Sequence, residues 1–187
     1  MVVLASKVYV HGGARERALD SLESLVGNAL GDLDVDFEVG LRHDDFPTVT
    51  VEGPDATVAR NLLREEWGEV LPDAEAGSVA VGTLESWDED GFTLDAGREV
   101  FVPASEFGLG GGTPSQIRKR FGLVQHLPIR YEAGDTPSIA DVERDRLYGW
   151  QRAEMGRVNV NSATRAEVRA TVNRAGHAND IVTVERL

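Results

Sequence analysis

The chain contains no cysteine, and this absence excludes several kinds of chemistry at once. Without thiols the protein has no disulfide framework, no thiolate nucleophile, no cysteine-ligated zinc site and no iron–sulfur cluster. Only 4 histidines occur among the 187 residues, so few imidazole ligands remain for a metal. We therefore expect neither a cofactor nor a bound metal.

The sequence also lacks long apolar runs. No stretch approaches the ~18 apolar residues that indicate a membrane-spanning helix. Residues 1–10 hold neither the uninterrupted apolar core nor the cleavage pattern of a signal peptide. Because 41% of the residues are nevertheless apolar, the chain has enough material for a hydrophobic core. We expect a folded, cytoplasmic protein without a membrane partner.

Lysine is almost absent. Lys7 and Lys119 stand against 17 arginines, and the formal net charge is −13. An acid excess with so little lysine is expected of a protein kept soluble in concentrated salt, where charge repulsion is screened within a few ångströms. A GC-rich genome would also favour arginine codons. Both interpretations fit a salt-loving microbe, and either makes the total charge a poor guide to partners.

The excess negative charge is unevenly distributed over three blocks, which loop-like stretches separate. Residues 1–76 carry 6 basic and 16 acidic residues, net −10; residues 77–134 carry 5 and 8, net −3; residues 135–187 carry 8 and 8, net zero. This asymmetry suggests that the later two blocks share a surface that must not be strongly negative. A difference in exposed area alone explains it equally well.

The first block, residues 1–76, has the pattern of a small α/β sandwich. Apolar residues alternate in two of the three predicted strands and recur at three and four positions in two predicted helices, which Gly31 and Gly68 end. The order β-α-β-β-α places two helices on one face of a sheet. The strands are expected at residues 7–10, 34–40 and 47–51, and the helices at residues 14–30 and 54–67.

The second block, residues 77–134, changes to short strands joined by tight turns. Strands are predicted at residues 79–87, 92–94 and 99–102, with acid-plus-glycine turns between them. Thr113 and Gln116 have the spacing of a capping box, which predicts a short helix ending at Phe121. Residues 127–131 form a fourth strand. Three strands, a short helix and a further strand are the order of an OB barrel.

The third block, residues 135–187, predicts a β-α-β segment. It has a strand at residues 157–160, a helix that Ser162 caps and Gly176 ends, and a strand at residues 180–184. This segment pairs with the sheet of the first block or stands alone. Residues 139–142 fit either the closing strand of the barrel or a helix over residues 137–150. The fold class expected for the whole chain is α+β.

Two segments of the second block carry a family resemblance. Gly91-Phe92-Thr93-Leu94-Asp95-Ala96-Gly97 is followed by Val100-Phe101-Val102-Pro103-Ala104-Ser105-Glu106-Phe107. These residues resemble the RNA-binding OB barrel repeated in ribosomal protein S-one, and the resemblance implies a barrel that contacts RNA. The whole chain is also similar to an archaeal, salt-adapted family that is catalogued only as a domain of unknown function.

Aromatic and basic residues of this block make up the predicted interface. Two strand phenylalanines would stack on bases, a contact worth about 1–3 kcal/mol per base, and a basic rim would follow the backbone. The alternatives are ordinary: a strand phenylalanine is typical of a core, and a short basic run is typical of a solvated helix face. The predicted nucleic-acid-binding residues are Phe92, Arg98, Phe101, Arg118, Lys119, Arg120, Phe121 and Arg130.

None of the candidate catalytic or metal-binding motifs is complete. His43-Asp44-Asp45 has no second ligand cluster to support it, so we interpret it as a hairpin turn. His11-Gly12-Gly13 lacks the signature of a phosphate-binding loop and is also interpreted as a turn. Ser105 beside Glu106 has no histidine at a motif spacing. We therefore expect a protein that is not an enzyme.

Two functions of different classes remain. In the first, the chain is a non-catalytic nucleic-acid-binding protein that holds single-stranded RNA on the barrel. In the second, it is an adaptor that docks onto a larger protein assembly and makes no nucleic-acid contact. Exposure of Phe92 and Phe101 side by side on the barrel would favour the first function, and their burial would count against it.

Overall fold

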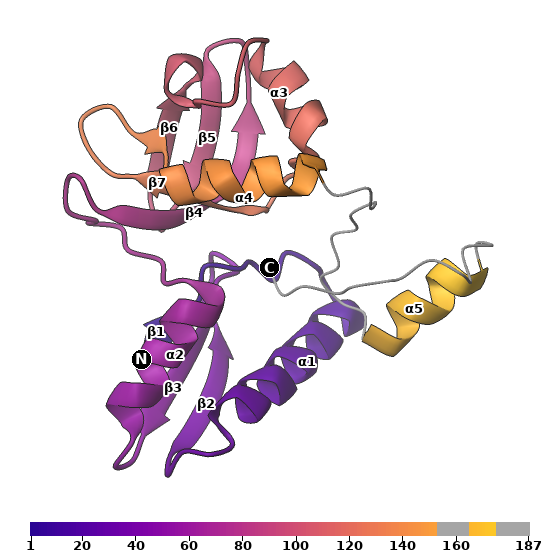
Figure 1. Cartoon of the computed structure of the whole chain (residues 1–187). Coiled ribbons are helices and arrows are strands. Elements are labelled where there is room, and N and C mark those ends of the chain that lie inside the picture. The colour runs from indigo at the N-terminus through magenta and orange to yellow at the C-terminus, as the bar shows by residue number, and fades with distance from the viewer. Residues whose placement is uncertain (153–164, 175–187) are drawn as a thin grey trace.

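The computed structural model describes residues 1–152 and 165–174. Within residues 1–152 the chain forms two modules, which Figure 1 shows one above the other. The N-terminal module contains a three-stranded sheet, and the central module contains a five-stranded antiparallel sheet curled into a half-barrel. The predicted α+β class is confirmed.

The N-terminal module has helices on one face of its sheet. The sheet contains β1 (Val2–Val3), β2 (Asp36–Leu41) and β3 (Pro47–Glu52) in the antiparallel order β1-β3-β2. The helices α1 (Gly13–Leu30) and α2 (Ala56–Trp67) contact each other and pack on the sheet (Figure 1). The predicted order β-α-β-β-α is confirmed. The core between the layers includes Val2, Leu4, Val26, Leu30, Val49, Val51, Ala59 and Leu63.

The strand predicted at residues 7–10 is wrong, because the first strand is Val2–Val3. In this segment Val8 is buried, whereas Lys7 and Tyr9 contact the central module. The N–H of Val8 donates to the carbonyl of Asp45 at 2.8 Å. Asp45 belongs to the predicted turn at residues 43–45. The pattern therefore reflects contact between modules rather than strand pairing.

The long strand β4 (Val79–Trp87) curls the central sheet. Its first half pairs with β7 (Pro128–Glu132). Its second half pairs with β5 (Gly91–Asp95), and an irregularity between Leu84 and Ser86 interrupts that ladder. An irregularity of this kind bends a strand and increases its twist. The edges are β6 (Glu99–Pro103) and β8 (Ser138–Ile139), so the strand order is β6-β5-β4-β7-β8.

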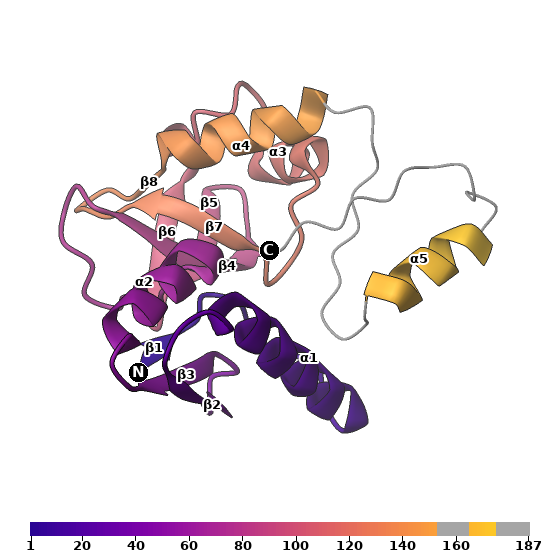
Figure 2. The same ribbon diagram turned by 60° about the horizontal axis from the view of Figure 1, so that its bottom comes forward.

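Two helices and a short turn of 3₁₀-helix complete the central module. The 3₁₀ turn η1 (Ala104–Glu106) follows β6, and α3 (Pro114–Phe121) precedes β7. The predicted capping box is confirmed: Gln116 N–H donates to Thr113 Oγ1 at 3.3 Å, and Thr113 N–H donates to Gln116 Oε1 at 3.0 Å. In Figures 1 and 2, α3 lies beside α4 (Asp141–Arg152).

Residues 139–142, which fitted both a strand and a helix, divide between the two. Ile139 ends β8 and pairs with Tyr131, whereas Val142 lies in the first turn of α4. Leu147 of α4 is buried in the same core as Ile139. The boundary predicted between residues 134 and 135 therefore falls inside the central module, which continues to Arg152.

Beyond Arg152, the described part of the third block is α5 (Arg165–Arg174), which agrees with the helix predicted there. The strands predicted at residues 157–160 and 180–184 lie outside the described residues. None of the described helices is both long enough and apolar enough to cross a membrane.

Candidate nucleic-acid interface

A groove of about 370 Å³ lies beside the free edge of β6. The β5–β6 turn and strand β6 form one wall, and the loop between β7 and β8 forms the other. The groove exists because β6 and β8 lie at opposite ends of the strand order and, among the described residues, form no ladder with each other. Its lining residues are Arg98, Glu99, Val100, Phe101 and Pro103 on the first wall, and Gly134, Asp135, Thr136 and Pro137 on the second.

Phe101 supplies the aromatic surface of this groove. Its side chain is 40% exposed, although β6 is a strand in a packed module. The ring lies over Gly91 of the neighbouring strand, where a Cβ atom would fall 2.8 Å from the ring and 2.2 Å from the carbonyl oxygen of Val102. A larger residue than glycine at position 91 would therefore displace the ring from its place on the sheet.

Arg98 supplies the positive charge of the groove. It is exposed and makes no ion pair or side-chain hydrogen bond with any residue in the described ranges. The turn before it is fixed, because Gly97 N–H donates to Asp95 Oδ1 at 2.9 Å and Gly97 has a φ of 78°. Arg98 therefore projects from an ordered turn with its guanidinium available for a ligand.

Tyr131 places a buried hydroxyl at the same end of the sheet. Its side chain is 1% exposed, and the hydroxyl has no hydrogen-bond partner among the described residues. Burial raises the pKa of the phenol, while the charge of Arg98 lowers it and so partly offsets the effect.

The other two predicted aromatic residues are not on the surface. Phe92 is 0% exposed and stacks on Phe107, with 4.1 Å between ring centroids. Phe121 is 4% exposed and meets Tyr148 edge-on at 5.2 Å. The prediction that Phe92 stands beside Phe101 as a stacking platform is corrected, since antiparallel register places the two rings on opposite faces of the sheet.

Both arginines of the basic run on α3 make contacts within the protein. Arg118 donates to the carbonyl of Leu123 at 2.8 Å, and its guanidinium lies 4.2 Å from the ring centroid of Trp87. Arg120 donates to the carbonyls of Leu109 and Gly111. These contacts hold the loops on either side of α3. Lys119, between the two arginines, is exposed.

Arg130 lies apart from the groove and is paired. Its guanidinium is 3.3 Å from Glu143 Oε2, and Arg146 approaches the same oxygen at 3.4 Å. Glu143 has no exposed side-chain area. A buried carboxylate left without its cations is costly, so these arginines are expected to remain with Glu143. Of the eight predicted residues, the groove thus brings together Arg98 and Phe101.

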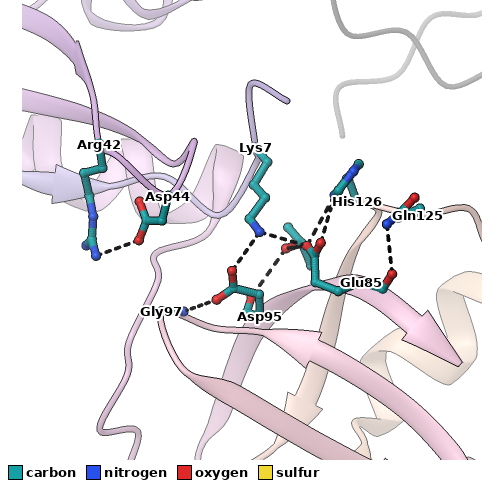
Figure 3. Close-up of polar contacts among 9 residues, drawn as sticks. Lys7, Arg42, Asp44, Glu85, Asp95, Gly97, Gln125 and His126 are labelled. Atoms are coloured by element: carbon teal, nitrogen blue, oxygen red, sulfur yellow. Dashed lines mark hydrogen bonds and ion pairs between the residues drawn. The ribbon is translucent and has the colours of Figure 1, made fainter. Parts of the chain in front are cut away.

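Sequence reasoning missed a polar cluster between the two modules (Figure 3). Lys7 Nζ lies 3.0 Å from Glu85 Oε1 and 2.7 Å from Asp95 Oδ2. His126 Nδ1 lies 3.1 Å from Glu85 Oε2, and the His126 ring stacks on Tyr9 at 4.3 Å. The cluster therefore joins the N-terminal segment to β4, β5 and the loop before β7.

The charges of this cluster stabilise one another. Burial alone would raise the pKa of Glu85, but hydrogen bonds from Thr83 and Lys7, together with the charge of Lys7, leave it below its ordinary value. Burial alone would lower the pKa of Lys7, but Asp95 and Glu85 leave it raised. A signal in the sequence existed, since Lys7 is one of only two lysines in a chain with 17 arginines.

The described residues contain no group of three or more histidine, aspartate or glutamate side chains arranged to hold a metal ion. The cluster around Lys7 does not qualify, because the ammonium already occupies the position between Glu85 and Asp95. Its arrangement fits the joining of modules, and the groove at Phe101 is the better candidate for a ligand.

Comparison with protein families covers nearly the whole chain. The DUF2110 N-terminal domain matches residues 1–73, the DUF2110 central domain matches residues 74–151, and the DUF2110 C-terminal domain matches residues 155–187. No curated protein matches the chain. The similarity to a domain of unknown function, predicted from the sequence, is confirmed, and the chain belongs to the DUF2110 family.

Proposed function

We propose that this protein binds single-stranded RNA, without catalysing a reaction, in the groove between β6 and the β7–β8 loop. The observation that carries the proposal is the meeting of Phe101 and Arg98 in one groove. Single-stranded nucleic acids are held by bases that stack on aromatic rings and by cations that follow the backbone. An exposed ring beside an unpaired guanidinium supplies one of each.

The order of the central elements supports the proposal. Strands β4, β5 and β6, helix α3 and strands β7 and β8 follow one another as in an OB module, which binds oligonucleotides on its second and third strands and the loop between its fourth and fifth. In the central module the corresponding elements are β5, β6 and the β7–β8 loop. The groove is lined by β6 and by that loop.

The direct test is fluorescence anisotropy of a labelled single-stranded RNA of about 12 nucleotides, within the ~4–16-nucleotide site of an OB fold. Wild-type protein is expected to bind, and Phe101→Leu to weaken binding about tenfold, because leucine preserves the apolar cover over Gly91 but removes the stacking face. Phe101→Tyr keeps the ring and is the matched control.

Among the predicted binding residues, Arg98 and Lys119 form no ion pair in the described part of the chain, and they give a second matched pair. Arg98→Gln and Lys119→Gln each remove one positive charge from an exposed side chain, but only Arg98 lines the groove. We expect Arg98→Gln to weaken binding and Lys119→Gln to leave it unchanged within about twofold. Equal losses would mean binding by general electrostatics, and a wild-type protein that binds no RNA across a salt series would contradict the proposal.

The second candidate function is a protein-interaction adaptor, and a different hollow favours it. The segment between α2 and β4 forms a hollow of about 470 Å³. Leu71 lines this hollow and is 43% exposed. Val79, which follows the lining residue Ser78 in the sequence, is 53% exposed. Exposed apolar residues around a hollow suit a protein partner. This function would be supported if the wild-type protein binds no RNA but binds a protein partner, and if the Leu71→Asp variant no longer binds that partner.

A further inference from the structure

The RNA groove contains two carboxylates that a site for phosphate alone would not need. Glu99 and Asp135 line opposite walls, and both are exposed. Neither makes an ion pair or a side-chain hydrogen bond with any residue that the structure describes. A carboxylate accepts hydrogen bonds but cannot donate them, and it repels a phosphate. A ligand group that meets these carboxylates is therefore favoured when it carries N–H donors and no negative charge, and in a nucleic acid the base edges carry such donors.

The position of Glu99 links these carboxylates to the stacking ring. Glu99 and Phe101 are two residues apart on β6, so their side chains leave the same face of the strand about 7 Å apart. Asp135 approaches from the β7–β8 loop. The edge of a base that stacks on Phe101 would therefore lie between the two walls, within reach of Glu99 on one and Asp135 on the other.

We propose that the groove is a base subsite selective for guanine, in which Phe101 stacks on the base and Glu99 and Asp135 accept hydrogen bonds from its Watson–Crick edge. This inference rests on the proposed RNA-binding function. Guanine presents adjacent N1–H and N2–H donors, which one carboxylate accepts together. Uracil presents a single N–H between two carbonyl oxygens, and those oxygens face the carboxylates unfavourably. Recognition of splayed-out bases through their Watson–Crick edges is the usual means of reading single-stranded RNA.

The size of the groove agrees with a single base. Its volume of about 370 Å³ lies near the lower end of the ~300–1,000 Å³ range of small-molecule sites. Pro103 and Pro137 add apolar walls without adding donors or flexible charge. The remaining nucleotides of a bound strand would lie outside the groove, so selectivity is expected at one position of the RNA rather than along it.

The test compares a labelled oligouridine of about 10 nucleotides with the same oligomer carrying one central guanosine. Wild-type protein is expected to bind the guanosine-containing RNA about tenfold more tightly, as expected for a bidentate base contact. The double variant Glu99→Gln with Asp135→Asn is expected to reduce this preference to less than about twofold. Its affinity for oligouridine should stay unchanged or rise, because two negative charges have left the groove.

The possible outcomes distinguish failure of guanine selectivity from failure of the proposed RNA binding. Equal wild-type affinities for the two RNAs would overturn guanine selectivity while leaving RNA binding intact, as would a preference that survives in the double variant. If wild-type protein binds neither RNA, the proposed function fails first. A double variant that weakens both RNAs equally would indicate a structural role for the two acids and would also overturn the inference. Circular dichroism of each variant checks the fold.

Discussion

The buried hydroxyl of Tyr131 lies in an environment that does not match its chemistry. It has left water without gaining a hydrogen-bond partner among the described residues. Burial of an unpaired hydroxyl costs about 1–3 kcal/mol in proteins. The neighbouring Arg98 charge lowers the phenol pKa that burial raises, but it supplies no hydrogen bond.

Replacing this tyrosine should therefore stabilise the protein. We expect Tyr131→Phe to raise the free energy of unfolding by about 1 kcal/mol, because the variant removes an unpaired hydroxyl and keeps the ring that fills the core. Urea unfolding followed by circular dichroism measures the change. Tyr9→Phe, at a partly exposed ring, is the control and should change little. A destabilised Tyr131→Phe would mean that the hydroxyl has a partner in solution.

The relative positions of Phe92 and Phe101 could not be predicted from the sequence. Alternation within one strand shows which of its residues share a face. To know whether residues of two neighbouring strands share a face, the pairing register set by the turn is also needed. In the structure Asp95 pairs with Glu99, so Phe92 lies opposite Val102 and Phe101 lies opposite Thr93. The rings therefore lie on opposite faces of the sheet. A one-residue shift of the turn would have put them on one face.

At the scale of elements, local signals predicted the helices well. Gly31 and Gly68 follow α1 and α2, and the capping box begins α3 as the spacing predicts. Where prediction failed, the cause was not local. Residues 7–10 lie between the two modules. Residues 139–142 divide between β8 and α4, because β8 joins the sheet and α4 packs against β7. Tertiary contacts decide such segments, and the sequence pattern is compatible with several of them.

The capping box offers a prediction for α3. Thr113→Ala removes the oxygen that accepts from Gln116 N–H, so we expect a loss of about 1 kcal/mol in the free energy of unfolding. Ser115→Ala, inside the same first turn, removes a hydroxyl that caps nothing and is the control. Both changes are measured by urea unfolding. Equal effects would contradict the role of Thr113 as the cap.

At the scale of the whole molecule, the two modules are joined by groups from distant parts of the sequence. Lys7 meets Glu85 and Asp95, which lie 78 and 88 positions later. A small apolar cluster of Ala5, Phe46 and Val70, with Val81 packed against it, adjoins this contact. The excess negative charge lies mainly before residue 77, and Lys7 is one of only 6 basic residues in that segment. Adaptation to concentrated salt remains a prediction from that composition.

The charge state of this junction should make stability depend on pH at both ends of the scale. The folded pKa of Glu85 lies below its ordinary value of 4.5, so its contribution is present above pH 4.5 and is lost as the pH falls through the folded pKa. The folded pKa of Lys7 lies above its ordinary value of 10.5, so its contribution is present below pH 10.5 and is lost as the pH rises through the folded pKa. Between these limits both groups are charged.

The variant Lys7→Met tests the junction by removing the ammonium, which also lies 5.0 Å from the centroid of the Phe46 ring, while keeping an unbranched side chain. We expect its melting temperature to fall a few degrees below that of wild type at neutral pH, because Glu85 and Asp95 lose their shared cation. The difference should shrink as the pH falls below 4.5, since neutral Glu85 no longer needs Lys7. Lys119→Met removes the other lysine and should melt like wild type at every pH. Calorimetry across pH gives both differences, and a Lys7→Met deficit that stays constant in acid would show that the junction is held by packing rather than by charge.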